Sequence, residues 1–426
     1  MRILVIGINY APERTGVAPF NTGLCEHLAT QSHEVKVITG FPYYPEWRVA
    51  DGYRGRLYQR ERINNVEVRR VWHFVPRRPS ALLQRLAHDL SFTVSAFLAG
   101  LFAGKFDVVY CSCPPPTAGL AAYALAKMRG KTYVIKLTDL ATDAAVATGI
   151  MQEGLALRLG RALEGFIYRK AGKVVCLCQG FIQKLQARGI QTEKLQVIPD
   201  WSDTDRIHPV PRPEAFRKTH DLSEGQFVVM HTGNMGKKQD LLNVVRAAEL
   251  SQNIPDLLWL LVGQGEERAL LEGEIARRKL RNIRLLPLQP AESLAEMYSS
   301  ADVLLLNQKA SVRDAVIPSK LLTYMAAGRP VLAAANERSE AAEQILRSEC
   351  GIVVSPENPA ALVEGALSLR KDSSLCQRLS ANGRTSAETH FTKRRVLQDY
   401  VALFTRYKTP NADPELKVSH KVSATR

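Results

Sequence analysis

The sequence predicts an α/β protein of two domains, each built around a parallel β-sheet. Short apolar runs bounded by turn residues alternate with helical runs along most of the chain, which is the pattern of repeated β-α units. Its 426 residues suit two domains of about 200 residues each rather than one core. The proline-rich stretch His208–Pro213 separates two series of such units, so it is the expected linker.

The first domain is expected to cover residues 1–205. It opens with an apolar strand at Arg2–Ile8, a loop at Asn9–Gly16 and a helix over Val17–Ser32. The loop lacks the G-x-G-x-x-G spacing of dinucleotide-binding enzymes, which argues against such a cofactor, and no cofactor is expected. Further strands are predicted at Val35–Thr39, Asp107–Cys113, Thr132–Leu137 and Lys173–Cys178.

The positive charge of the chain is concentrated in this first domain. Residues 1–199 hold 26 Lys and Arg against 14 Asp and Glu, whereas residues 200–426 hold 31 against 28. The segment Arg48–Arg78 alone contains nine arginines and three acids, and Leu90–Gly104 is an uncharged stretch too short to span a bilayer. No helix-turn-helix, RNP or zinc-finger text accompanies the arginines, so nucleic acid is not expected, and an anionic lipid or lipid diphosphate is the favoured partner. Solvated charges and a core helix are the alternative interpretations of the two segments.

Cysteine usage and acid spacing bear on the compartment and on metal binding. The seven cysteines include two C-x-C pairs, Cys111 with Cys113 and Cys176 with Cys178, on apolar strand-like runs. These pairs predict buried free thiols in a reducing, cytoplasmic compartment, and their spacing does not suit zinc. Asp203-Thr-Asp205 has the D-x-D spacing of a metal motif, but it lies at the domain junction, and no metal is expected.

The second domain is expected over residues 206–390. Its first strand runs into the loop Thr232–Gln239, whose two glycines let the backbone approach a ligand and whose two lysines offer charge for a diphosphate. Pro318 and Ser319 open a helix over Lys320–Ala327, and a helix start favours a phosphate. Strands are predicted at Gln226–His231 and Val331–Ala335. Between them the runs Leu258–Glu266, Arg284–Leu288 and Ala301–Leu306 follow the glycine loop in order. Helix is predicted from Ala360 to about Tyr407, and a disordered polar tail at 408–426.

The segment PSKLLTYMAAGRPVLA at Pro318–Ala333 resembles the donor-site text of family 4 glycosyltransferases, which fold as two Rossmann-like domains facing a cleft, the GT-B fold. Near the N-terminus, INYAPERTG and PYYPEW resemble a narrower group of that family, the colanic-acid fucosyltransferases. The family's donor motif carries two glutamates that this chain lacks. When Gly328 and Pro330 are aligned, they fall on Ala315 and Thr323.

This resemblance implies a retaining, metal-independent glycosyltransferase of exopolysaccharide or capsule biosynthesis. The donor would be a nucleotide-diphosphate sugar, with GDP-fucose as one candidate, and the acceptor a lipid-diphosphate-linked saccharide. A final helix, residues 391–407, would cross back to the first domain. The protein would be cytoplasmic and bound peripherally to the inner face of the cell membrane through its basic and apolar segments. Because both glutamates are missing, a sugar-nucleotide-binding protein without transfer activity is the alternative.

The residue patterns and the resemblance together give three sets of site residues. The expected catalytic residues are Lys238, Lys237, Asp314 and Asp139, with solvated charge as the alternative for the lysines and helix capping for Asp139. The expected acceptor-binding residues are Thr15, Gly16, Tyr43 and Tyr44, with a packed aromatic lid as the alternative. The expected donor-binding residues are Gly233, Asn234, Gly236, Gly265, Glu266, Leu286, Pro318, Ser319, Lys320 and Thr323.

Overall fold

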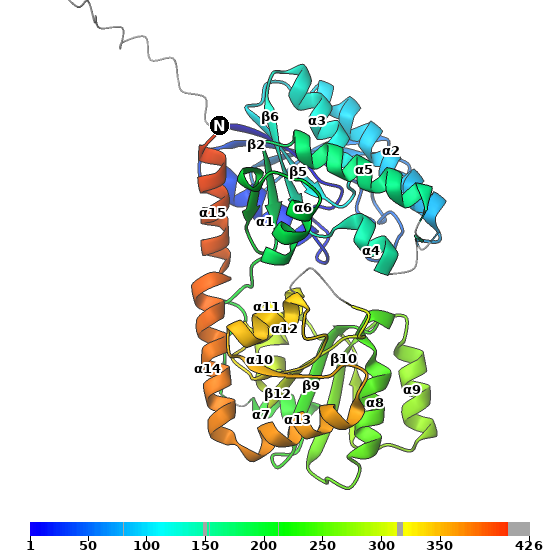
Figure 1. Ribbon diagram of the computed structural model, residues 1–426, viewed down its shortest axis with the longest axis vertical. Helices are drawn as coiled ribbons and strands as arrows, with labels where there is room; N and C mark the ends of the chain where they lie inside the picture. Colours follow the sequence, from blue (N-terminus) through cyan, green and yellow to red (C-terminus); the bar gives the residue numbers. More distant parts are fainter. Residues whose placement is uncertain (80, 148–150, 153, 212, 313–317, 408–426) are drawn as a thin grey trace, which may run out of the picture.

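The computed structural model describes residues 1–407 apart from residues 80, 148–150, 153, 212 and 313–317. Two α/β domains lie one above the other along the long axis of the molecule, and a run of helices at the end of the chain follows one side of both (Figure 1). Each domain is a largely parallel sheet with apolar side chains packed on both of its faces. The predicted fold class of two Rossmann-like domains is confirmed.

Within the described residues, the first domain contains an eight-stranded sheet of order β3-β4-β2-β1-β5-β6-β7-β8, in which β3 alone is antiparallel to its neighbour. Successive side chains of β1 point to opposite faces, so Leu4 and Ile6 join one core and Ile3 and Val5 the other. The strands are β1 Arg2–Ile6, β2 Glu34–Gly40, β3 Tyr58–Ile63, β4 Val66–Val71, β5 Val108–Cys113, β6 Thr132–Leu137, β7 Lys173–Cys176 and β8 Leu195–Val197.

Helices cover both faces of this sheet. Side chains of α2, α3, α5 and α6 pack on one face, and those of α1 pack on the other. In the described part of the chain, no helix has the length and apolar character needed to cross a bilayer. The helices are α1 Ala18–Thr30, α2 Leu82–Leu101, α3 Ala118–Met128, α4 Ala141–Ala147, α5 Leu155–Lys170, α6 Gln179–Ala187 and the 3₁₀ turn η1 Thr192–Lys194.

The arginine-rich segment contains a β-hairpin, β3–β4, that the sequence analysis missed. Arg69 and Arg70 lie on β4 and are buried, so interpreting all nine arginines as one solvated or ligand-facing run is wrong for these two. Arg70 donates to Glu61 at 2.5 Å and to the Gly40 carbonyl at 3.2 Å, which neutralises and satisfies its guanidinium. Seven arginines of the segment remain exposed among the residues described: 48, 54, 56, 60, 62, 77 and 78.

The second domain contains, in its described residues, a six-stranded parallel sheet of order β11-β10-β9-β12-β13-β14. Its strands are β9 Phe227–Asn234, β10 Leu257–Gln264, β11 Ile283–Leu286, β12 Val303–Asn307, β13 Val331–Ala334 and β14 Gly351–Val354. Its helices are α7 Glu214–Thr219, α8 Leu241–Leu250, α9 Arg268–Arg277, α10 Leu294–Ser299, α11 Ser319–Ala326, α12 Glu340–Arg347, α13 Pro359–Lys371 and α14 Ser373–His390, with 3₁₀ turns η2 Lys237–Gln239 and η3 Ala291–Ser293.

The last helix, α15 Lys393–Thr405, belongs to the core of the first domain. Val396, Leu397, Tyr400, Leu403 and Phe404 are buried in one cluster with side chains of β1, β2, β4 and β5. Figure 1 shows α14 beside the second domain and α15 beside the first. The predicted tail, 408–426, lies outside the described residues. All seven cysteines are described, each lies outside any disulfide, and six of them are buried.

Candidate active site

The carboxyl ends of the strands in the two sheets face each other, which is where parallel sheets bind ligands. A hydrogen bond between the two domains joins two helix starts on these facing sides. Glu340 begins α12 just beyond β13, and its carboxylate oxygen Oε1 accepts a hydrogen bond from the backbone N–H of Gly180, near the start of α6, at 2.6 Å. A Cβ on Gly180 would lie only 2.1 Å from that oxygen. The sequence analysis did not single out either residue.

Two glycine-containing loops lie together where β9 and β10 end. Gly233 has φ +104°, a conformation that favours glycine. A Cβ on Gly263 would lie 1.8 Å from the Gly233 carbonyl oxygen, and a Cβ on Gly265 would lie 2.4 Å from the Met235 carbonyl oxygen. The glycines therefore allow the two backbones to approach, which explains Gly265 as a requirement of packing as much as of ligand binding.

Lys320, in the first turn of α11, reaches back to the end of β9. Its ammonium Nζ lies 3.4 Å from His231 Nε2 and would lie 3.8 Å from a Cβ placed on Gly233. Lys237 and Lys238 are instead exposed on η2. Lys237 and Lys238 are therefore not the only lysines at this loop, because a helix turn that is distant in sequence brings Lys320 to Gly233.

Burial sets the protonation of this pair. It lowers the pKa of Lys320 to about 8. Burial, and then the Lys320 charge, holds the pKa of His231 well below its usual range. His231 Nδ1 lies 3.3 Å from the Leu305 carbonyl oxygen. A neutral His231 would donate from Nδ1 to this carbonyl, which leaves Nε2 to accept from the Lys320 ammonium.

Tyr324 holds the end of β9 against α11 and β12. Its buried hydroxyl accepts a hydrogen bond from the Thr232 backbone N–H at 3.0 Å and donates one to the Leu305 carbonyl at 3.3 Å. The Thr232 hydroxyl also lies 3.4 Å from the Tyr298 hydroxyl. The backbone that leads into Gly233 is therefore fixed by buried hydrogen bonds, which suits a ligand site that must keep its shape.

The remaining donor-side predictions are scattered around this centre. Pro318 is the N-cap of α11 rather than its first helical residue, because it is extended with ψ 130°, and the helix begins at Ser319. The Thr323 hydroxyl donates to the Ser319 carbonyl at 3.2 Å, so its bond lies within the helix. Asp314 and Ala315 lie outside the described residues. Asn234, Glu266 and Ser319 are exposed, Gly236 is buried, and Leu286 is partly buried, its carbonyl accepting from Arg268.

On the acceptor side, the structure separates the four predicted residues. Tyr43 is buried, and its hydroxyl lies 3.1 Å from His88 Nε2, so this residue belongs to an aromatic core rather than to an open binding surface. Tyr44 is partly exposed and Thr15 and Gly16 are exposed, and a Cβ on Gly16 would lie 3.2 Å from the Tyr44 ring. Thr15, Gly16 and Tyr44 remain candidates.

Glu13 organises these acceptor-side loops, although the sequence analysis did not select it. Its Oε1 accepts the backbone N–H groups of Tyr43 and Tyr44, both at 2.8 Å, and its Oε2 accepts the Asn9 amide at 2.9 Å. Burial raises the pKa of this carboxyl. The carboxylate thus joins the loop after β1 to the loop after β2.

The acidic residues considered for catalysis or metal binding lie apart. Asp139 is exposed just beyond β6, at the carboxyl edge of its sheet. Asp203 Oδ1 accepts the Arg206 backbone N–H at 3.2 Å, which is a turn contact. Over the part of the chain that the structure describes, no three His, Cys, Asp or Glu side chains are grouped as a metal site would require.

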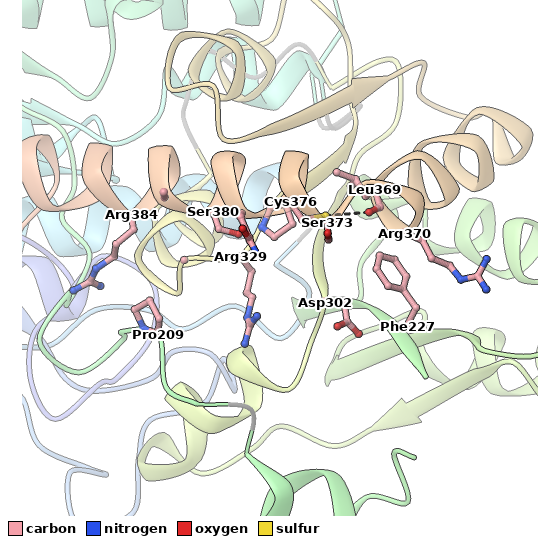
Figure 2. Close-up of a pocket in the computed structure, with 14 residues that line it drawn as sticks. Pro209, Phe227, Asp302, Arg329, Leu369, Arg370, Ser373, Cys376, Ser380 and Arg384 are labelled. Carbon is pink, nitrogen blue, oxygen red and sulfur yellow. Dashed lines mark hydrogen bonds between the residues drawn. The ribbon is translucent and has the colours of Figure 1, made fainter. Parts of the chain in front are cut away.

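A cavity of about 700 Å³ lies at the opposite edge of the second sheet, beneath α13 and α14 (Figure 2). Phe227, Asp302 and Pro330 bring the amino ends of three strands to it. Its arginines are occupied by the protein: Arg370 pairs with Asp256 at 2.6 Å, and Arg384 donates to the Ala326 carbonyl at 2.6 Å. Its location and these contacts make it a packing feature and not the donor site.

Comparison with known proteins agrees with this geometry. The sequence matches the glycosyl transferase 4-like domain over residues 15–201 and the glycosyl transferases group 1 domain over residues 213–386. It is 33% identical over 410 residues to the putative colanic acid biosynthesis glycosyl transferase WcaI of Escherichia coli K12, a match that covers 94% of this chain and 99% of that protein. It is 22% identical over 402 residues to the N-acetyl-alpha-D-glucosaminyl L-malate synthase of Bacillus anthracis, with 94% and 96% covered.

Solved structures share the fold at low sequence identity. Sucrose-phosphate synthase from Thermosynechococcus elongatus superposes with a TM-score of 0.74 at 18% identity and covers 95% of this chain and 98% of its own. Anabaena Alr3699/HepE, solved in complex with UDP, gives 0.71 at 16% identity and covers 95% and 100%. With two matched domains and a relative similar over its whole length, the chain belongs to the family 4 glycosyltransferases of GT-B fold.

Proposed function

We propose that this glycosyltransferase moves a sugar from a nucleotide-diphosphate donor to a lipid-diphosphate-linked saccharide during exopolysaccharide synthesis, with retention of anomeric configuration and without a bound metal. The observation that supports it best is the meeting of the Gly233–Gly236 loop with the first turn of α11, which brings a glycine backbone, a helix start and a lysine together at the carboxyl edge of the second sheet. Similarity to the colanic acid protein of Escherichia coli supports the pathway class.

In this reaction the main contribution of the protein is to stabilise developing charge. The bond between the anomeric carbon and the diphosphate oxygen breaks, and a bond to the acceptor hydroxyl forms on the same face of the sugar. The acceptor proton passes to the leaving diphosphate, so no protein base is required. Backbone N–H groups and cations aimed at the diphosphate would stabilise its developing charge. Lys237, Lys238, Asp139 and Asp314 remain candidate contacts around this centre.

The acceptor side has a surface that suits a membrane. The outer face of α2 exposes an apolar stripe at helical spacing, with Leu83, Leu90, Val94 and Leu98 each at least half exposed, and the stripe continues to Phe102. Leu57 lines a groove with Leu98 and Phe102, and also an adjoining groove with Arg48, Arg54 and Arg56. Apolar area beside arginines supplies the two signals that stable peripheral binding to an anionic bilayer needs.

The direct test is transfer. The purified protein is incubated with radiolabelled GDP-fucose and a panel of radiolabelled UDP-sugars, together with a lipid extract from a polysaccharide-producing bacterium, and label in the organic phase is counted. We expect one donor to label a lipid-linked saccharide. Mild acid hydrolysis should release the labelled saccharide from the lipid. Donor binding without labelled product, under conditions where a relative is active, would favour the sugar-nucleotide-binding alternative.

A further inference from the structure

A partly buried lysine, whose described side-chain partner is an imidazole, stands at the proposed donor site. Lys320 meets His231 across the end of β9, with 3.4 Å between Nζ and Nε2, and faces Gly233. Among the residues that the structure describes, no ion pair to Lys320 is found. An ammonium has three N–H donors and His231 accepts one, so the others are available to a ligand or to solvent.

We propose that the Lys320 ammonium, positioned by neutral His231, is the cation that contacts the donor's diphosphate and stabilises the charge developing there as the sugar leaves. Lys320 would be a catalytic residue and His231 a positioning residue. This assignment rests on the proposed function, because it names the group that would hold the donor of that reaction.

A fully buried lysine in the first domain shows what a purely structural one looks like in this chain. Lys136 lies on β6 of the first domain, and its ammonium pairs with the Asp200 carboxylate at 2.6 Å. That partner neutralises the charge, and the pKa of Lys136 is raised even though burial alone would lower it. Lys320 has a neutral imidazole in the corresponding place. Among the described residues no carboxylate lies beside the Lys320 ammonium, and an anionic ligand is a partner that would offset the cost of its desolvation.

The other two lysines of the site differ from Lys320 in how they are held. Lys237 and Lys238 extend from the short turn η2 and are exposed, so their side chains keep their freedom until a ligand arrives. Lys320 is fixed by an eight-residue helix that Tyr324 ties to Thr232. A cation already in place loses less entropy on binding and needs less reorganisation in the transition state. This favours Lys320 over Lys238 for the main contact to the diphosphate.

The experiment compares full-length wild type with K320M, K320R and K238A, and uses K218A, an exposed lysine on α7, as the matched control. Calorimetric titration with GDP, UDP, ADP and CDP gives the dissociation constants, and guanosine and uridine serve as ligands without phosphate. We expect K320M to weaken diphosphate binding by about 10- to 100-fold, since charged hydrogen bonds contribute on that order. Nucleoside binding should not change, and K320R should recover part of the loss.

Thermal unfolding separates function from folding. K320M removes a charge that burial disfavours, so its thermal midpoint should equal or exceed that of wild type while its binding falls. H231L should weaken diphosphate binding selectively, whereas H231Q, whose side-chain oxygen can still accept from Lys320, should retain more of it. A purely structural His231 would move the thermal midpoint and leave the ratio of diphosphate to nucleoside affinity unchanged.

The outcomes distinguish two kinds of failure. If wild type binds none of the four nucleoside diphosphates, the proposed function is wrong. If wild type binds one and folded K320M binds it equally well, the proposed function stands and the assignment of Lys320 is overturned. If K238A alone loses binding, the exposed lysines carry the diphosphate, and Lys320 is again excluded.

Discussion

Protonation of Lys320 gives a pH dependence that can be measured on the intact protein. Burial lowers its pKa to about 8, so the free protein loses this proton as the pH rises through 8. If a diphosphate binds the protonated form, affinity should be level below pH 8 and fall by up to about tenfold per pH unit above it. The packed neighbours do not titrate in this window, because the pKa of His231 lies far below it and those of Tyr298 and Tyr324 are raised.

The check is a titration of wild type and K320R with the nucleoside diphosphate from pH 7 to 10. The arginine stays charged, so its affinity should be level throughout. The stability of the folded protein changes with pH in the direction opposite to the affinity. The folded pKa lies below the unfolded value of about 10.4, so the cost of burying the charge is complete below pH 8 and is relieved as the pH rises toward 10.4. K320M should lack this rise, and a wild-type affinity level to pH 10 would contradict the assignment.

Metal dependence is a second prediction about single residues. Asp203 and Asp205 have the spacing of a metal motif, but Asp203 accepts the Arg206 N–H within a turn. We therefore expect transfer to survive EDTA, and D203A to lower activity less than about threefold, since an exposed turn contact contributes little. Initial rates with and without EDTA, followed by addition of Mg²⁺ or Mn²⁺, measure this. Loss of activity under EDTA that D203A reproduces would show that the metal-free mechanism is wrong.

For single residues, the sequence predicts well which residue types lie near the donor site. It predicts less well which of their side chains face inward. Spacing placed Lys237, Lys238 and Lys320 near one glycine loop, but which ammonium lies against Gly233 depends on how α11 packs on β9. Tyr43 and Tyr44 are adjacent and of one type, and only burial separates the core residue from the exposed one. Glu13 and His231 act through backbone and ring contacts from distant segments, which no spacing rule reveals.

Among the elements, α2 makes the clearest prediction. His88, Phe92, Ala96 and Gly100 form its buried face, while Leu90 and Leu98 lie on the exposed face. L90E/L98E should therefore keep the thermal midpoint within about 2 °C and lower binding to anionic vesicles at least about tenfold, because both apolar area and charge balance are lost.

The matched control is L250E/L346E, which changes two leucines of similar exposure in the second domain. Binding is measured by sedimentation with vesicles of phosphatidylglycerol and phosphatidylcholine at low and high salt. Wild type should prefer the anionic vesicles and be released by salt. Equal binding of both double mutants, or binding to neutral vesicles that salt leaves unchanged, would remove α2 from the membrane surface.

The elements that the sequence predicted best are the buried parallel strands, whose continuous apolar runs leave little ambiguity. The hairpin β3–β4 was not predicted because half of its side chains are charged. Its buried Arg70 is neutralised by Glu61 on the facing strand, a pairing that the local sequence pattern does not reveal. Helix α11 begins at Ser319, one residue before the predicted Lys320, and the extended Pro318 before it serves as the N-cap. Boundaries of this kind depend on the cap geometry and not on hydrophobic period.

For the whole molecule, the hydrogen bond between Glu340 and Gly180 predicts how the two domains are held together. A methyl group on Gly180 would lie 2.1 Å from the Glu340 carboxylate, so G180A must break this contact or separate the domains locally. We expect G180A to increase the radius of gyration in small-angle X-ray scattering and to lower the thermal midpoint.

Adding E340A removes the group that clashes, so the two substitutions should be strongly non-additive. G225A is the control, because nothing lies within 4 Å of the added Cβ there. If G180A scatters and melts as G225A does, the contact does not hold the domains. If E340A fails to recover any of the loss caused by G180A, the loss comes from α6 alone.

The return of α15 to the first domain has a consequence for how the chain is made. The side chains that complete the core beside β1 and β5, among them Tyr400 and Phe404, are the last described part of the chain to leave the ribosome. Until they arrive, the part of that sheet face which α1 does not cover stays exposed while the whole second domain is synthesised. The first domain is therefore completed by a helix that follows the second domain in sequence, so the two domains do not fold as a simple succession of independent units.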